Sequence, residues 1–185
     1  MIRNKLLWKS NKQQYGLIIK GLHWLSALTV FVLFGLGFWM VDLDYYSEWY
    51  QRAPHWHESI GLLLLIVTLI RLLWRGIDRK PDAINEHSLL EKKLSTIMVY
   101  SLYTILFAVL ISGYLITSAD GKAIEIFAWF TVPAFVLITD NQEDLAGAMH
   151  YYIAYILIFM AIVHALAALK HHFFDKDNTL KRMIK

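Results

Sequence analysis

A long apolar segment that contains two histidines limits the folds open to this chain more than any other feature. Residues 145–169 carry no acidic or basic side chain, and a helix of this length crosses a hydrocarbon core of about 30 Å. His150 and His164 lie 14 residues apart, so they return to nearly the same helix face, about 21 Å apart along the axis. Ionisable residues inside membrane helices are usually functional, and these two predict ligand sites at two depths of one membrane.

Three further apolar segments extend this prediction to the whole chain. Of the 185 residues, 57% are hydrophobic, above the roughly 45–50% of ordinary soluble domains. We therefore predict an all-α protein, a single domain of residues 1–185 that forms an integral membrane four-helix bundle surrounded by lipid. The predicted spans are residues 17–41, 55–74, 94–116 and 145–169.

The distribution of positive charge predicts how the bundle is oriented. Most of the 18 lysines and arginines lie in residues 1–20, 71–93 and 170–185, whereas the other two connections contain only Arg52 and Lys122. By the positive-inside rule, this pattern places both the N- and C-termini in the cytoplasm. Because the basic residues flank apolar spans, we do not expect nucleic acid as a partner.

Two more histidines match the depths of the first two. The first span enters from the cytoplasm, so His23 is expected at the depth of His164. The second span enters from the external side, so His57 is expected at the depth of His150. The four residues therefore form two predicted pairs, each between the fourth span and a different neighbour.

Haem held between two axial imidazoles fits such pairs well. The chain contains no cysteine, which excludes thiolate ligands and covalent c-type attachment, so the expected cofactors are two haems b. Zinc is a weaker candidate, because each depth offers two good ligands where zinc prefers four. A proton relay would more often include a carboxylate in mid-span. In a purely structural alternative, each histidine bonds a neighbouring carbonyl or serine.

Three other features were considered near these pairs. Arg71 follows His57 by 14 residues, so it is expected at the deeper site, where it either pairs with a haem propionate or extends its side chain to the interface. The same spacing favours His57 over His55 as the external ligand. His171 and His172, next to Lys170, either bond a quinone carbonyl or meet lipid headgroups.

The connections carry fewer signals. We expect His87 to be solvated in a polar loop, and the third span, which has no histidine or charge, to be a packing wall. Residues 117–143 are expected to form an interfacial aromatic helix and loop, because Glu125 and Pro133 interrupt their apolar run. With Trp129, Phe130 and Phe135, this segment is a candidate docking surface.

The chain resembles the bacterial cytochrome b561 family along nearly its whole length. The motifs that carry the resemblance are HWLSA at 23–27, HESIG at 57–61, RLLWR at 71–75, SGYLITSADGK at 112–122 and HALAALKHHFFDKDNTLKRM at 164–183. The family consists of four-helix dihaem b-type cytochromes of the bacterial inner membrane. The resemblance implies one haem for His23 with His164 and another for His57 with His150.

The resemblance also implies a function. Family members exchange electrons with the quinone pool, and one relative is a superoxide oxidase that reduces ubiquinone. The likeness is to a subgroup often associated with a periplasmic isoprenoid-binding, lipocalin-like protein. We therefore expect single-electron transfer between a periplasmic donor or acceptor and quinone, with superoxide:ubiquinone oxidoreductase activity as one form of it. The alternatives are a haem-bearing anchor for a periplasmic redox partner and, further off, a transporter without haem. The physiological donor and acceptor and the oligomeric state are left open.

Overall fold

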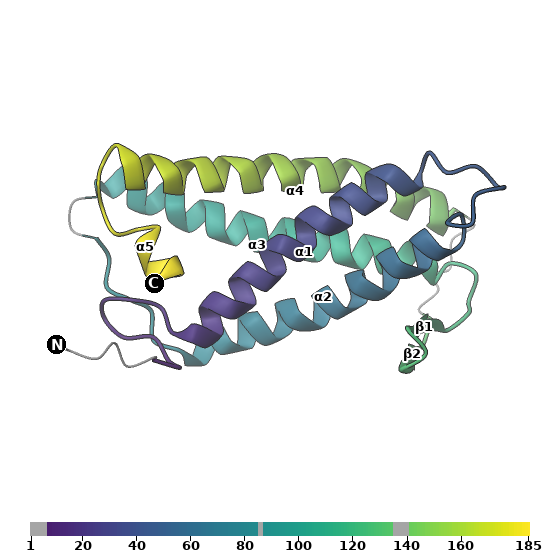
Figure 1. Ribbon diagram of the computed structural model, residues 1–185, viewed down its shortest axis with the longest axis horizontal. Helices are drawn as coiled ribbons and strands as arrows, with labels where there is room; N and C mark the ends of the chain where they lie inside the picture. The colour runs from purple at the N-terminus through teal and green to yellow at the C-terminus, as the bar shows by residue number, and fades with distance from the viewer. Residues whose placement is uncertain (1–6, 85–86, 135–140) are drawn as a thin grey trace.

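Four long helices lie along one axis and form a bundle (Figure 1). The structure is a computed structural model, which describes residues 7–84, 87–134 and 141–185. The helices are α1 Leu17–Met40, α2 Arg52–Ile77, α3 Leu89–Thr117 and α4 Gln142–Phe173, followed by the short α5 Lys181–Ile184. Each of the four long helices is long and apolar enough to cross a membrane. The predicted all-α, membrane-spanning fold is therefore confirmed.

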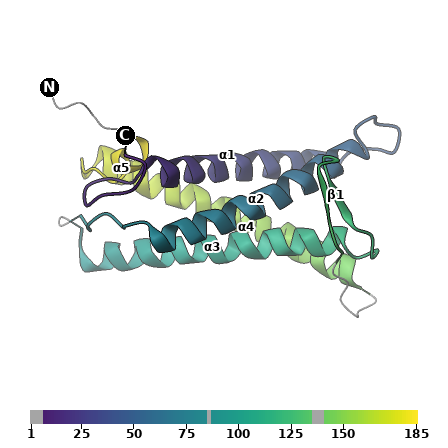
Figure 2. The same ribbon diagram turned by 90° about the horizontal axis from the view of Figure 1, so that it is seen from below.

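The helices pack in a chain of neighbours. α1 lies against α2, α2 against α3, and α3 along α4, and Figure 2 shows α1 and α3 on opposite sides with α2 and α4 between them. All four contribute to one buried apolar cluster, which consists of Leu33, Leu64, Leu106, Val109, Leu110 and Leu157. Many large apolar side chains on the outside of the helices are exposed, as expected of surfaces that face lipid rather than water.

The two ends of the bundle differ. The end that we call the terminal end holds the described N-terminal segment, the connection from α2 to α3 and the C-terminal tail (Figure 1). Backbone and side-chain contacts tie these segments together: the Asp82 amide donates to the Lys12 carbonyl at 2.9 Å, and the Ser10 hydroxyl donates to Asp78 at 2.5 Å. The opposite end, which we call the hairpin end, holds the connection from α1 to α2 and a small β-sheet.

α3 begins five residues before the predicted span. Ser88 accepts a hydrogen bond from the Glu91 amide at 3.2 Å, and the Glu91 carboxylate accepts one from the Ser88 amide at 2.9 Å. This reciprocal pair is a capping box, which satisfies two of the free amides at a helix start. The S-x-x-E signal is visible in the sequence, but a prediction based on the apolar run alone begins the helix too late.

The prediction of an interfacial helix in residues 117–143 is wrong where the structure describes them. The strands β1 Ile124–Ile126 and β2 Phe130–Val132 pair antiparallel, with Ile126 opposite Phe130. Phe127 and Ala128 have φ values of 45° and 60°, and the Trp129 amide donates to the Ile126 carbonyl at 2.8 Å. Such turns normally use glycine or asparagine, so no turn signal marked this hairpin. Packing decides it instead, because Ile126 is fully buried in a cluster with Leu62 of α2.

Candidate functional site

The histidine pair nearer the hairpin end joins α2 to α4. The imidazole rings of His57 and His150 have centroids 6.0 Å apart and planes inclined at 75°. His150 Nδ1 lies 2.9 Å from the Val109 carbonyl, which can only accept, so this nitrogen carries the proton. His150 Nε2 is then the unprotonated nitrogen that is able to bind a metal.

Two glycines leave room for these rings. A Cβ at Gly37 of α1 would stand 3.1 Å from His57 Cε1, and a Cβ at Gly113 of α3 would stand 3.1 Å from His150 Cε1. Carbon atoms pack comfortably at about 3.5–4.0 Å, so any larger residue would push either imidazole away. His57 Nδ1 is buried and has no hydrogen-bond partner among the described residues. Glycine on α1 and α3 thus forms the two sides of this site.

The second pair lies nearer the terminal end and joins α1 to α4. The rings of His23 and His164 have centroids 6.5 Å apart and planes inclined at 76°. The Arg71 guanidinium, from α2, donates to His23 Nδ1 at 2.7 Å and lies 5.2 Å from the centre of the Tyr103 ring. Arg71 is therefore the deeper-lying partner that the 14-residue spacing predicted, beside the inner pair.

The separations within the pairs fit a metal held between two imidazoles. With about 2 Å for each metal–nitrogen bond and about 1 Å from each nitrogen to its ring centre, two axial imidazoles stand about 6 Å apart. The observed 6.0 and 6.5 Å match this value. The glycine contacts, the carbonyl-bonded His150 and the orphaned His57 Nδ1 agree with it.

The Arg71 contact adds a condition. Arginine can only donate, so His23 Nδ1 accepts in this arrangement and the proton of the neutral ring lies on Nε2. Binding a metal through Nε2 needs the opposite tautomer, with the proton on Nδ1. The guanidinium must therefore leave His23 when the pair holds a haem.

The remaining sequence candidates lie elsewhere. His55 is 3.2 Å from Glu58 and its side chain is 40% exposed, so it does not join His57 and His150. His172 Nδ1 is buried without a partner among the described residues. Lys170 donates to Asp175 at 2.7 Å, and this ammonium lowers the pKa of the Asp175 carboxyl.

The expectation that His87 is solvated is wrong. Its side chain is only 16% exposed, and Nε2 lies 2.6 Å from Asp177 Oδ2. The partner is 90 residues away along the chain, so the local sequence could not indicate it. Sequence reasoning also missed Gly37, Gly113 and the Val109 carbonyl, because nothing distinguishes them from other residues of the apolar spans.

Comparisons with known proteins agree with this geometry. A family model described as Prokaryotic cytochrome b561 matches residues 14–185. The chain is 46% identical over 172 residues to Cytochrome b561 homolog 2 of Escherichia coli (strain K12), covering 93% of this chain and 92% of that protein. It is 27% identical over 163 residues to Cytochrome b561 homolog 1 of the same organism, covering 88% and 92%.

A further relative carries a more specific name. The chain is 30% identical over 184 residues to Probable superoxide oxidase CybB of Yersinia pestis, covering 93% of this chain and 96% of that protein. Matches over nearly full length, together with four membrane helices and paired histidines, identify the family. This chain belongs to the prokaryotic cytochrome b561 family, multi-pass membrane proteins that bind b-type haem and transfer electrons.

Proposed function

We propose that this protein is a dihaem cytochrome that carries single electrons across the bacterial inner membrane between a periplasmic partner and the quinone pool. One observation carries the proposal: two imidazole pairs, with ring centres 6.0 and 6.5 Å apart, share α4. Their α4 members are 14 residues apart, or about 21 Å along the helix. Two haems at this spacing would connect the two membrane surfaces.

Each pair has a defined role in this proposal. His57 and His150 would hold one haem b, and His23 and His164 the other. A bound haem supplies a one-electron couple, and two axial histidines leave its iron no open position for oxygen. The protein's own groups then set the potentials. Arg71, once displaced from His23 Nδ1, is the cation placed to pair with a propionate of the inner haem.

The orientation follows from charge. The terminal end carries the basic N-terminal segment, the basic α2–α3 connection and the basic tail, so we assign it to the cytoplasm. The His23–His164 pair then serves the cytoplasmic side and the His57–His150 pair the periplasmic side.

A quinone site near the inner pair is part of the proposal. His172 Nδ1 is buried and has no hydrogen-bond partner among the described residues, which suits a group that bonds a quinone carbonyl. Lys170 is engaged with Glu91 and Asp175, and His171 lies 2.7 Å from Asp175, which makes these two weaker candidates. If replacing both His171 and His172 by alanine leaves quinol-dependent haem reduction unchanged, this site is wrong.

Superoxide is a candidate electron donor, on the strength of the Yersinia pestis relative's name. Attraction of this anion by the periplasmic surface is weak, because Lys122 already pairs with Asp120 at 2.8 Å and Arg52 is the other basic residue there. Measuring ubiquinone reduction by the purified protein, with and without a superoxide source, tests this activity directly.

A haem-bearing anchor for a periplasmic redox partner is the second candidate. Trp129 is 72% and Phe130 43% exposed on the hairpin, as a docking surface requires; Phe135 lies outside the described residues. An isoprenoid-binding, lipocalin-like protein is one such partner. Isolation of a stable complex that Trp129→Ala disrupts would favour this role.

The first experiment is a haem count with reduced-minus-oxidised spectra of purified protein. We expect two b-type haems in the wild type. His150→Ala should lose the external haem and His164→Ala the inner one, with the other haem retained in each variant. Colourless protein, or unchanged haem in both variants, would contradict the ligand assignment.

A further inference from the structure

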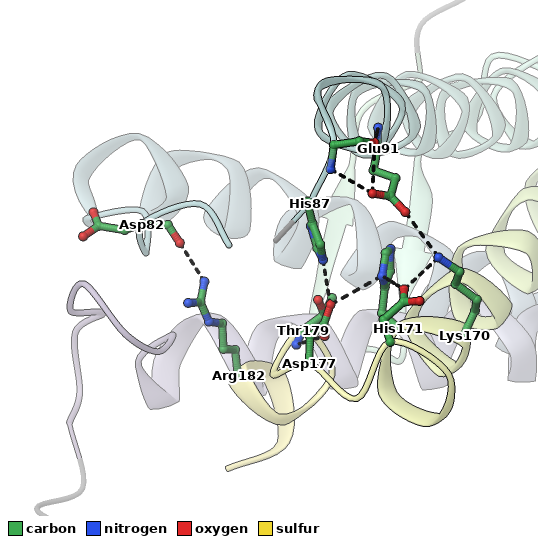
Figure 3. A network of polar contacts seen from close by, with 10 residues as sticks. Asp82, His87, Glu91, Lys170, His171, Asp177, Thr179 and Arg182 are labelled. Atoms are coloured by element: carbon green, nitrogen blue, oxygen red, sulfur yellow. Dashed lines mark hydrogen bonds and ion pairs between the residues drawn. The ribbon is translucent and has the colours of Figure 1, made fainter. Parts of the chain in front are cut away.

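A cluster of histidine and carboxylate side chains lies at the terminal end, apart from both imidazole pairs (Figure 3). Its members come from three segments: His87 precedes α3, His171 ends α4, and Asp177 lies in the tail before α5. One ligand atom from each of the three lies within 4.8 Å of the other two. We propose that these residues bind a divalent transition-metal ion of the zinc class.

The donor atoms converge on one point. Asp177 Oδ2 lies 2.6 Å from His87 Nε2 and 3.4 Å from His171 Nδ1. Ligands of a tetrahedral ion at about 2.0–2.2 Å stand roughly 3.3–3.5 Å apart, so one contact already has the required length. The other must open by less than about 1 Å to admit the ion.

The fourth position also has a candidate. Asp175 Oδ2 lies 2.7 Å from His171 Nδ1, although it shares Lys170 as a cationic partner. Either this carboxylate or water would complete the coordination. Two imidazoles with one or two carboxylates suit zinc and its neighbours among the transition metals better than Mg²⁺ or Ca²⁺, which prefer oxygen ligands.

The surroundings hold the ligands in place. The Thr179 amide donates to Asp177 Oδ1 at 2.7 Å, which leaves Oδ2 facing the imidazoles, and such support from outside the ligand shell is typical of metal sites. The His87 and His171 rings stack with centroids 4.4 Å apart. The side chains of His87, His171 and Asp177 are 16%, 16% and 8% exposed.

The cluster is also accessible from water. A cavity of about 850 Å³ is lined by His87, Glu91, Asp175 and Asp177, and an ion can reach the ligands through it. Arg182 borders the same cavity, but its guanidinium donates to the Asp82 carbonyl at 2.7 Å.

An ion at this position would join the α2–α3 connection, the end of α4 and the tail. The tail in turn reaches the inner histidine pair: the Met183 carbonyl accepts a hydrogen bond from Trp24 Nε1 at 2.9 Å, and the Trp24 ring lies 5.3 Å from that of His23. Metal binding would therefore stabilise the tail against the end of the bundle beside this pair.

The test is calorimetric titration of Zn²⁺ into chelator-treated, haem-loaded protein that carries no histidine tag. The variants are His87→Gln, which keeps a hydrogen-bond donor for Asp177 but removes the imidazole, and Asp177→Asn. His55→Gln is the matched control, because His55 also contacts a carboxylate, Glu58 at 3.2 Å, but lies at the hairpin end. The haem content of each variant shows whether it is folded.

We expect the wild type and His55→Gln to bind one equivalent of Zn²⁺ with equal affinity, and both cluster variants to bind it more than about tenfold more weakly. Three results would overturn the proposal: no saturable binding to the wild type, undiminished binding to both cluster variants, or an equal loss in His55→Gln.

Discussion

Gly37 offers the sharpest test of the external histidine pair. A Cβ at this position would lie 3.1 Å from His57 Cε1 and 3.6 Å from His57 Nδ1. To restore a carbon–carbon separation of about 3.5–4.0 Å, the ring in Gly37→Ala must retreat by about 0.4–0.9 Å. Metal–ligand distances tolerate about 0.2 Å. We therefore expect this single methyl group to break or weaken one axial bond.

The assay is the number of haems per protein, together with the electron paramagnetic resonance spectrum. Gly37→Ala should fall from two haems toward one, or keep both while one loses its low-spin bis-histidine signal. The inner haem should be unaffected, since His23 and His164 lie one site deeper. Gly113→Ala should have the same effect, because its Cβ would stand 3.1 Å from His150 Cε1.

Gly35→Ala is the control. It lies on the same helix, and no atom lies within 4 Å of a Cβ built there. Alanine is favoured over glycine in a helix by about 0.5–1 kcal/mol, so this variant should keep both haems and lose no stability. Two intact haems with unchanged spectra in Gly37→Ala, or an equal loss in Gly35→Ala, would refute the reasoning.

Three further predictions concern other parts of the chain. His57→Ala should lose one haem while His55→Ala keeps both, because His55 is 40% exposed and paired with a surface carboxylate; the haem count decides between them. Arg71→Gln should lower the midpoint potential of one haem by tens of millivolts in a redox titration, since a unit charge about 10 Å away is worth about 1–2 kcal/mol at an effective dielectric constant of about 20; equal shifts of both haems would contradict this. Ser88→Ala should cost about 1 kcal/mol through loss of the α3 cap, seen as a lower thermal midpoint, whereas Thr96→Ala, on the exposed face of the same helix, should change it little.

The sequence by itself determined the four spans and the four histidines. Backbone groups cannot be left unpaired in lipid, so apolar runs of this length must become helices. The rise of a helix then converts the 14 residues between His150 and His164 into two depths, and the entry side of each span assigns His23 and His57 to those depths. Arg71 followed from the same arithmetic, which depends on chain position alone.

Only the tertiary structure decided what surrounds these residues. Gly37 and Gly113 matter because neighbouring helices bring imidazoles within 3.1 Å of a built Cβ, and no local pattern separates them from Gly35 or Gly61. The hairpin forms because Ile126 is buried against α2, although its turn lacks the usual residues. His87 and Asp177 meet across 90 residues because α3 and α4 pack side by side. Side-chain contacts between distant segments depend on how the helices pack, and helical periodicity in a membrane span carries no record of that packing.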